Sequence, residues 1–226
     1  KRYKNLVGFT LGTGFGAGIV RNGDLFIGDN SGAAEVWLLR NKLHPEMNVE
    51  EGVSIRAVQR VYAELTKTSF EDAPSPKEIY DIGVGQASGN KEAAVEAFRQ
   101  MAVVLGDALG NVLTLIDTVA VIGGGVSGAA SLFLQPMIEE MRNTYKNFSG
   151  EVYPRLAVGA YNLEDEKELD VFLKGDSREI KVPGSERTLR YDPMSRVGVG
   201  MTKIGASKAI AIGAYAFALH ELDSKA

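Results

Sequence analysis

The stretch LGTGFGAGIVRNG at residues 11–23 decides how the chain begins to fold. Glycine stands at every second position from Gly12 to Gly18, so one face of the segment carries no side chains and its backbone N–H groups can approach an anion closely. Asn22-Gly23 is a turn signal that favours positive φ and joins antiparallel strands. With apolar runs on either side of the glycines, the sequence predicts an antiparallel meander at the start of the chain.

The glycine run also has to be compared with other glycine-rich motifs. Residues 12–17 fit G-x-G-x-x-A, a dinucleotide-binding fingerprint, but that motif requires the glycines to open a helix, whereas Ile19-Val20 and an Asn-Gly turn follow here. No Gly-Lys-Ser/Thr occurs, which excludes a Walker-type phosphate loop. A tight hairpin without any ligand remains the open alternative.

A second glycine cluster follows a strongly apolar strand candidate. Residues 118–122 are typical of a strand buried on both faces, and they end in Gly123, Gly124 and Gly125. We expect a helix after the glycines that reaches Tyr145. Backbone donors and a helix N-terminus would then lie at the carboxyl edge of a sheet, where ligands bind. The two glycine loops together predict a nucleotide held from two sides, and a flexible turn is the alternative.

Helical spacing predicts the elements that cover the sheet. Asn90 is a good N-cap, and apolar residues recur from Val95 to Ile116, which predicts one long helix over about 91–116. The remaining expected elements are helices from about 52 and 76, a strand over 155–161, a polar excursion over about 162–195 with a short strand at 180–182, and a close-packed helix over 203–222.

Composition restricts the function classes. The 226 residues carry 25 Lys+Arg and 29 Asp+Glu, a net charge of −4, and 45% are hydrophobic, which is typical of a soluble globular protein. The absence of Cys and the presence of only two His leave little material for a metal centre. Without a basic run or an apolar stretch of about 20 residues, neither nucleic acid nor a membrane is expected as a partner. The chain begins Lys1-Arg2-Tyr3, so we expect a fragment.

Several motifs then follow one another at a specific spacing. They are residues 11–23, SGAAEV at 31–36, EEGVS at 50–54, the predicted long helix at 89–117, VIGGGVS at 121–127 and the small-residue helix at 204–214. In this order they resemble the sugar kinases of the ROK group (repressors, open reading frames and kinases), within the actin-like ATPase superfamily. The resemblance covers residues 1 to about 150 and 198–220.

The resemblance implies a fold, an activity and a set of site residues. The implied fold is an α/β domain of the ribonuclease-H-like (actin-like ATPase) type, with a mixed β-sheet and helices on both faces. The implied activity is transfer of the γ-phosphate of Mg-ATP to a hexose or N-acetylhexosamine, by a cytoplasmic enzyme that forms a homodimer. The implied contacts are ATP phosphates at Gly12, Thr13 and Gly14, nucleotide at Gly123, Gly124 and Gly125, and sugar hydroxyls at Glu35 and Glu50. Ordinary surface acids are the alternative for the two glutamates.

The sequence also departs from the family pattern. The family's zinc-bound cysteine loop is absent, and residues 41–48 occupy its place. The family's histidine three residues after the first sugar-contact glutamate is Leu38 here; His44 is either a substitute contact or simply solvated. The family's first phosphate loop and its Asn-Asp pair, whose Asp is the general base, would precede the hairpin and have no counterpart, so we assign no catalytic residue and no metal ligand.

Three functional hypotheses follow. In the first, residues 1–226 are the C-terminal lobe of an ATP-dependent hexose or aminosugar kinase, inactive without an N-terminal lobe that is then its partner. In the second, the chain is the sugar-sensing effector domain of a ROK-type repressor, which Leu38 and the missing zinc loop favour. The third, a Rossmann-type oxidoreductase, needs a βα unit over residues 8–30, and a hairpin there would remove it.

Overall fold

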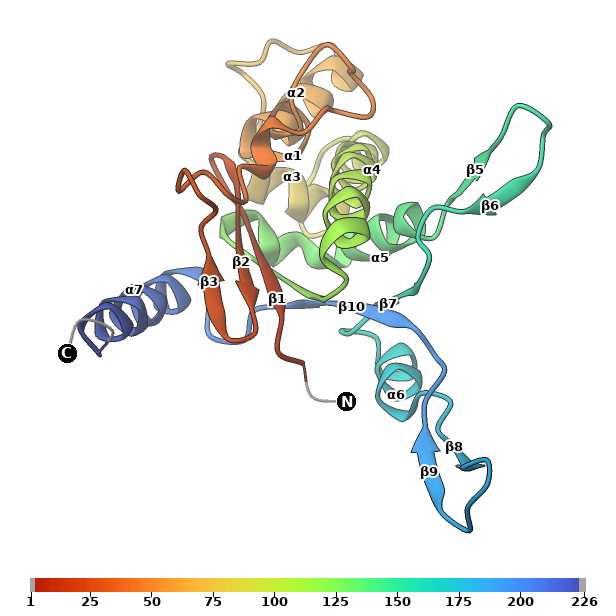
Figure 1. Cartoon of the computed structure of the whole chain (residues 1–226). Helices are drawn as coiled ribbons and strands as arrows, with labels where there is room; N and C mark the ends of the chain where they lie inside the picture. Colours follow the sequence, from red (N-terminus) through yellow and green to blue (C-terminus); the bar gives the residue numbers. More distant parts are fainter. Residues whose placement is uncertain (1–2, 224–226) are drawn as a thin grey trace.

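The structure, a computed structural model that describes residues 3–223, is organised by one six-stranded mixed sheet (Figure 1). The strand order is β3-β2-β1-β4-β10-β7. The strands of the sheet are β1 (Leu6–Leu11), β2 (Phe15–Arg21), β3 (Asp24–Phe26), β4 (Val119–Gly123), β7 (Gly159–Asn162) and β10 (Arg196–Met201). The helices are η1 (Val36–Leu38), α1 (Glu50–Val53), α2 (Ile55–Thr66), α3 (Pro76–Gly83), α4 (Lys91–Ile116), η2 (Gly125–Ala129), α5 (Ala130–Met141), α6 (Glu166–Lys174) and α7 (Ala206–Asp223). Two separate hairpins are β5 (Thr144–Lys146) with β6 (Val152–Pro154), and β8 (Arg178–Lys181) with β9 (Thr188–Tyr191).

The glycine-rich start of the chain is the predicted antiparallel meander. β1 pairs with β2 and β2 with β3, both antiparallel, while β1, β4, β10 and β7 run parallel to one another. Asn22 and Gly23, both with positive φ, make the turn between β2 and β3. No helix follows the glycines of residues 12–18, so the Rossmann-type hypothesis is wrong.

The long helix α4 begins and ends where the sequence predicts. The Asn90 side chain caps it by accepting a hydrogen bond from the Ala93 amide at 3.0 Å. Its buried face carries Phe98, Met101 and Leu105, while Leu115 in its last turn is 83% exposed. The helical segment expected from residue 52 is interrupted at Ser54, whose extended backbone separates α1 from α2.

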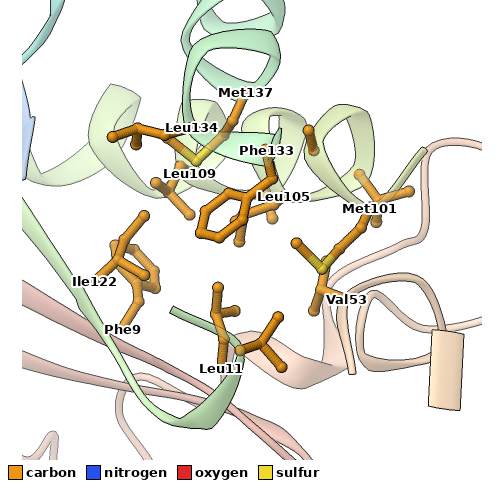
Figure 2. Close-up of a cluster of buried hydrophobic side chains, with 14 of the residues drawn as sticks. Phe9, Leu11, Val53, Met101, Leu105, Leu109, Ile122, Phe133, Leu134 and Met137 are labelled. Carbon is orange, nitrogen blue, oxygen red and sulfur yellow. The ribbon is translucent and has the colours of Figure 1, made fainter. Parts of the chain in front are cut away.

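The main core lies between the sheet and helices α4 and α5. On β1, buried Val7, Phe9 and Leu11 alternate with more exposed neighbours, as the period of two in a strand requires. Figure 2 shows Phe9 and Leu11 with Ile122 of β4 facing side chains of α4 and α5. Burying each such side chain stabilises the fold by about 1.5–3 kcal/mol. Helices α1–α5 lie on one side of the sheet and α6 on the other (Figure 1), so helices lie on both faces, as predicted.

One predicted helix ends earlier than expected, and one predicted strand begins later. The helix after β4 ends at Met141 rather than Tyr145, because Tyr145 instead pairs with Tyr153 in the β5–β6 hairpin, their ring centroids 6.0 Å apart. The strand expected over 155–161 begins only at Gly159. The preceding chain is held away from the sheet because the buried Arg155 side chain donates to Asn111 Oδ1 on α4 at 2.8 Å.

The polar excursion over 162–195 contains more regular structure than predicted. Besides the expected short strand, now β8, it holds helix α6, which Asp165 caps, and strand β9. Strand β10, which follows it, was not predicted, because its valines alternate with glycines. One of these, Gly198, leaves room for Leu163: a Cβ there would lie 2.7 Å from Leu163 Cδ1.

The C-terminal helix differs most from expectation. None of the residues of α7 is buried, although a close-packed helix was predicted. Figure 1 shows α7 projecting from the rest of the chain. Despite its apolar side chains, no helix within residues 3–223 is long and apolar enough to cross a membrane.

The contact between α4 and α5 depends on Gly106. A Cβ at this position would lie 2.6 Å from the Met137 carbonyl oxygen, which is backbone and cannot move without shifting α5. We predict that Gly106→Ala lowers the free energy of unfolding by about 1–3 kcal/mol in urea denaturation. The control Gly213→Ala, at an open position of α7, should be neutral or stabilise by up to about 1 kcal/mol. Equal effects of the two changes would contradict this account.

The polar excursion over residues 162–195 is joined to β10 by an ion pair that makes the stability of the fold depend on pH. The Arg196 side chain donates to Asp192 at 2.7 Å, and this bond, with amide bonds from Asp176 and Met194, lowers the pKa of Asp192 to about 2. In the unfolded chain the pKa is about 3.9, so the stabilisation is complete above that pH and is lost as pH falls through about 2.

We predict that Asp192→Asn lowers the melting temperature at pH 7 and flattens its decline between about pH 4 and 2. Melting temperatures recorded across this range measure both effects. The matched change Asp170→Asn, at an exposed position of α6, should leave the pH profile parallel to that of the wild type. Parallel profiles for Asp192→Asn as well would refute the role of the ion pair.

Candidate functional site

The loop between β1 and β2 offers unpaired backbone donors. Residues 12–14 form this loop, and the Gly12 amide donates to the Gly14 carbonyl at 3.0 Å, which closes it tightly. The amides of Thr13 and Gly14 donate to no other atom within residues 3–223. Two adjacent free N–H groups can donate to one anionic oxygen. Of the three predicted phosphate contacts, Thr13 and Gly14 therefore have free amides, whereas the Gly12 amide is already bonded.

The second glycine turn lies directly beside this loop. β1 and β4 pair in parallel with Thr10 opposite Gly123, so both strands end at the same edge of the sheet. Gly124 has φ +99°, and a Cβ there would lie 2.2 Å from the Leu11 carbonyl oxygen. The Ser127 hydroxyl donates to the Gly124 carbonyl at 2.6 Å and fixes the turn.

The two loops border one open hollow of about 480 Å³ at this edge of the sheet. Its lining brings together most of the predicted site residues: Gly12, Thr13, Gly14, Glu50, Gly124 and Gly125, together with Ala206 and Ile210 of α7. Gly123 does not line it, because this buried glycine faces Thr202 and Ala206 instead. The hollow combines backbone donors with little side-chain bulk, an arrangement suited to a phosphate chain.

An apolar hollow of about 350 Å³ adjoins the first one. Both hollows are lined by Gly125, which lies between them. The second one is lined by Ile55, Tyr80, Phe98 and Val126, with Lys77 and Ser75 among its polar residues. Sequence analysis missed these side chains as site residues, because Phe98 has the spacing of an ordinary core position and α3 carries no motif.

The two predicted sugar-contact glutamates lie in different surroundings. Glu50, at the start of α1, accepts a hydrogen bond from the Phe15 amide at 2.9 Å and lines the glycine hollow. Glu35 is exposed, accepts a hydrogen bond from the Trp37 indole, and lines a separate hollow with Val36 and Leu39. The structure therefore brings Glu50, but not Glu35, to the hollow of the glycine loops.

The segment at residues 41–48 is held by hydrogen bonds. Buried Asn41 accepts from the amides of Leu43 and His44 at 2.9 and 3.1 Å. The His44 side chain is 57% exposed and 3.8 Å from Glu46, and it does not line the glycine hollow. Within residues 3–223, no group of three or more His, Asp or Glu side chains is placed to hold a metal ion.

Comparisons with known proteins agree with this geometry. The sequence profile of the ROK family matches residues 1–161. An N-acetyl-D-glucosamine kinase from Yersinia enterocolitica is 28% identical over 151 residues, which cover 59% of this chain and 47% of that protein. The chain thus spans about half the length of the curated relative it matches.

Solved structures extend the similarity beyond residue 161. A glucokinase from Parabacteroides distasonis superposes with a TM-score of 0.89 and 48% identity, over 97% of this chain and 59% of that one. A ROK family glucokinase from Streptomyces griseus, in complex with glucose and AMPPNP, has a TM-score of 0.51 and 26% identity, over 63% of this chain and 51% of that one. The fold is therefore that of the actin-like ATPases. Since the family profile matches residues 1–161 of the 226, the chain belongs to the ROK family.

Proposed function

We propose that this chain is the C-terminal lobe of a cytoplasmic sugar kinase that transfers the γ-phosphate of Mg-ATP to a hydroxyl of a hexose or aminosugar. The observation that carries the proposal is the hollow lined both by Thr13 and Gly14, whose amides are free within residues 3–223, and by Gly124 and Gly125 of the second turn. The relative solved with glucose and AMPPNP supports both ligands.

The two adjoining hollows suit the two chemical parts of ATP. The phosphates, which are anionic, fit the hollow lined by backbone N–H groups, and Gly125 allows the nucleotide to pass closely from one hollow to the other. The adenine, flat and largely apolar, fits the hollow beside Tyr80 and Phe98. Mg²⁺ is bound in such sites largely by phosphate oxygens and water.

The sugar would bind beside the phosphates, with Glu50 and Glu35 as the acceptors that the resemblance implies. A carboxylate accepts charge-assisted hydrogen bonds from hydroxyls, and their geometry discriminates among sugar epimers. Glu50 already lies at the phosphate hollow, whereas Glu35 lies apart from it. In this proposal the N-terminal lobe supplies the first phosphate loop and the general base, and homodimerisation stays a prediction of the resemblance.

Helix α7 supports the proposal of a second lobe. Ile212, Tyr215, Leu219 and Leu222 follow one stripe of the helix, yet Ile210 and Phe217 lie on the opposite side. All six side chains are more than 40% exposed. A helix that is apolar on opposite sides is normally buried within a protein. We infer that the N-terminal lobe covers α7, whose first turns line the phosphate hollow.

A repressor effector domain of the same family is the second candidate, because Leu38 replaces the family's histidine. The kinase is favoured, since the relatives at 26–48% identity described above are kinases.

Nucleotide binding is the first test. We predict that Mg-ADP binds this chain in isothermal titration, and that Gly125→Asp weakens binding at least about tenfold, because a carboxylate placed between the hollows repels phosphate. Gly125 has open space around its Cβ position, so the fold should tolerate the change. The matched variant Gly125→Asn adds the same bulk without the charge and should lose much less affinity. Equal losses would argue against a phosphate at this point.

Catalysis and the second lobe are tested together. We predict no turnover by this chain alone in a coupled ADP-release assay with glucose or N-acetylglucosamine, and turnover once the N-terminal lobe is restored. The double change Ile212→Lys and Leu219→Lys should leave the melting temperature of this chain unchanged, since both side chains are exposed. The same double change should abolish turnover of the two-lobed protein. Robust turnover by this chain alone, or full activity of the lysine variant, would refute the arrangement.

A further inference from the structure

The loop between β1 and β2 (residues 12–14), which is the phosphate-binding loop of the proposed function, is held at both ends by residues 50–55. At its start, the Gly12 carbonyl accepts a hydrogen bond from the Ile55 amide at 2.9 Å. At its end, the Phe15 amide donates to Glu50 Oε2 at 2.9 Å. Glu50 is the first residue of α1 and Ile55 the first residue of α2. The segment at residues 50–55 and the loop between β1 and β2 are therefore joined at two points, although Phe15 and Glu50 are 35 residues apart in sequence.

The Glu50 bond is made to the amide of a buried residue. Phe15 is only 2% exposed, and its ring stacks on Phe9 with centroids 5.9 Å apart. If a backbone N–H at such a position loses its partner and finds no other, the free energy spent on removing it from water is not recovered. Removal of the Glu50 carboxylate would therefore release the end of the loop or leave its amide unpaired.

The loop and the carboxylate also fit one another in shape. A Cβ at Gly14 would lie 2.7 Å from Glu50 Oε2, so the loop passes directly against this oxygen. Glu50 thus holds Phe15, while the amides of Thr13 and Gly14 remain free. Arg56 Nη2 lies 3.5 Å from Glu50 Oε1 and offsets part of the repulsion between this carboxylate and a phosphate.

We propose that Glu50 is a positioning residue of the phosphate-binding loop, in addition to the sugar contact that the resemblance implies. This inference rests on the proposed nucleotide site. The two roles are compatible, because Oε2 holds the Phe15 amide and Oε1 keeps acceptor capacity for a hydroxyl. Glu50 then matters for nucleotide binding even when no sugar is present, which a sugar contact alone does not require.

The test is the affinity for Mg-ADP in the absence of sugar. Glu50→Ala should weaken Mg-ADP binding about tenfold, because one loop-ordering hydrogen bond of about 1.4 kcal/mol is lost. Glu50→Gln should stay within about threefold of the wild type, because its amide oxygen still accepts from Phe15. The neighbouring carboxylate Glu51 pairs with Arg60 and Arg56 and not with the loop, so Glu51→Ala should keep the affinity within about threefold of the wild type.

A second readout measures the fastening directly. Hydrogen exchange of the Phe15 amide should become at least about tenfold faster in Glu50→Ala and not in Glu51→Ala. An unchanged exchange rate, or unchanged or tighter Mg-ADP binding by Glu50→Ala when the wild type binds, would overturn the inference alone. Failure of the wild type to bind Mg-ADP would overturn the proposed function and this inference with it.

Discussion

The close approach of Gly124 to β1 is the constraint on which the site depends. Parallel pairing of β1 with β4 makes both strands end at one edge of the sheet. The turn after β4 then runs so near β1 that a Cβ on Gly124 would lie 2.2 Å from the Leu11 carbonyl oxygen, and its φ of +99° independently favours glycine. Space and backbone conformation both exclude a side chain there. The turn is thereby fixed beside the loop that follows β1.

Because of this contact, the edge of the sheet carries two hollows, and these differ in polarity. The glycines leave space at the first hollow, whose polar lining includes the free amides of Thr13 and Gly14 and the Glu50 side chain. Beyond Gly125, side chains of α2, α3 and α4 make the second hollow apolar. A ligand with an anionic part joined to a flat apolar part matches both at once. The fold generates this match because the helices that bury the sheet also supply the apolar wall.

Elements that depend on contacts between near neighbours in sequence could be predicted from the sequence. The cap at Asn90 and the turn at Asn22 are contacts between near neighbours in sequence, so both could be predicted. Strand β10 could not, because its glycines are explained by packing against the distant Leu163. The glycine loops of the site were predicted for the same local reason. The bond from Phe15 to Glu50 was not, because the pairing of residues 35 apart depends on where α1 packs.

The position of α1 depends in turn on the loop at residues 41–48. Buried Asn41 organises this loop, an ion pair from Lys42 to Glu140 ties it to α5, and a β-bridge joins its end at Asn48 back to Arg40. The Asn48 side chain also accepts from the Glu51 amide at 3.2 Å, at the first turn of α1. These contacts hold the start of α1, from which Glu50 reaches the loop between β1 and β2. The segment at residues 41–48 therefore bears on the geometry of the glycine hollow, and it does so through hydrogen bonds and an ion pair.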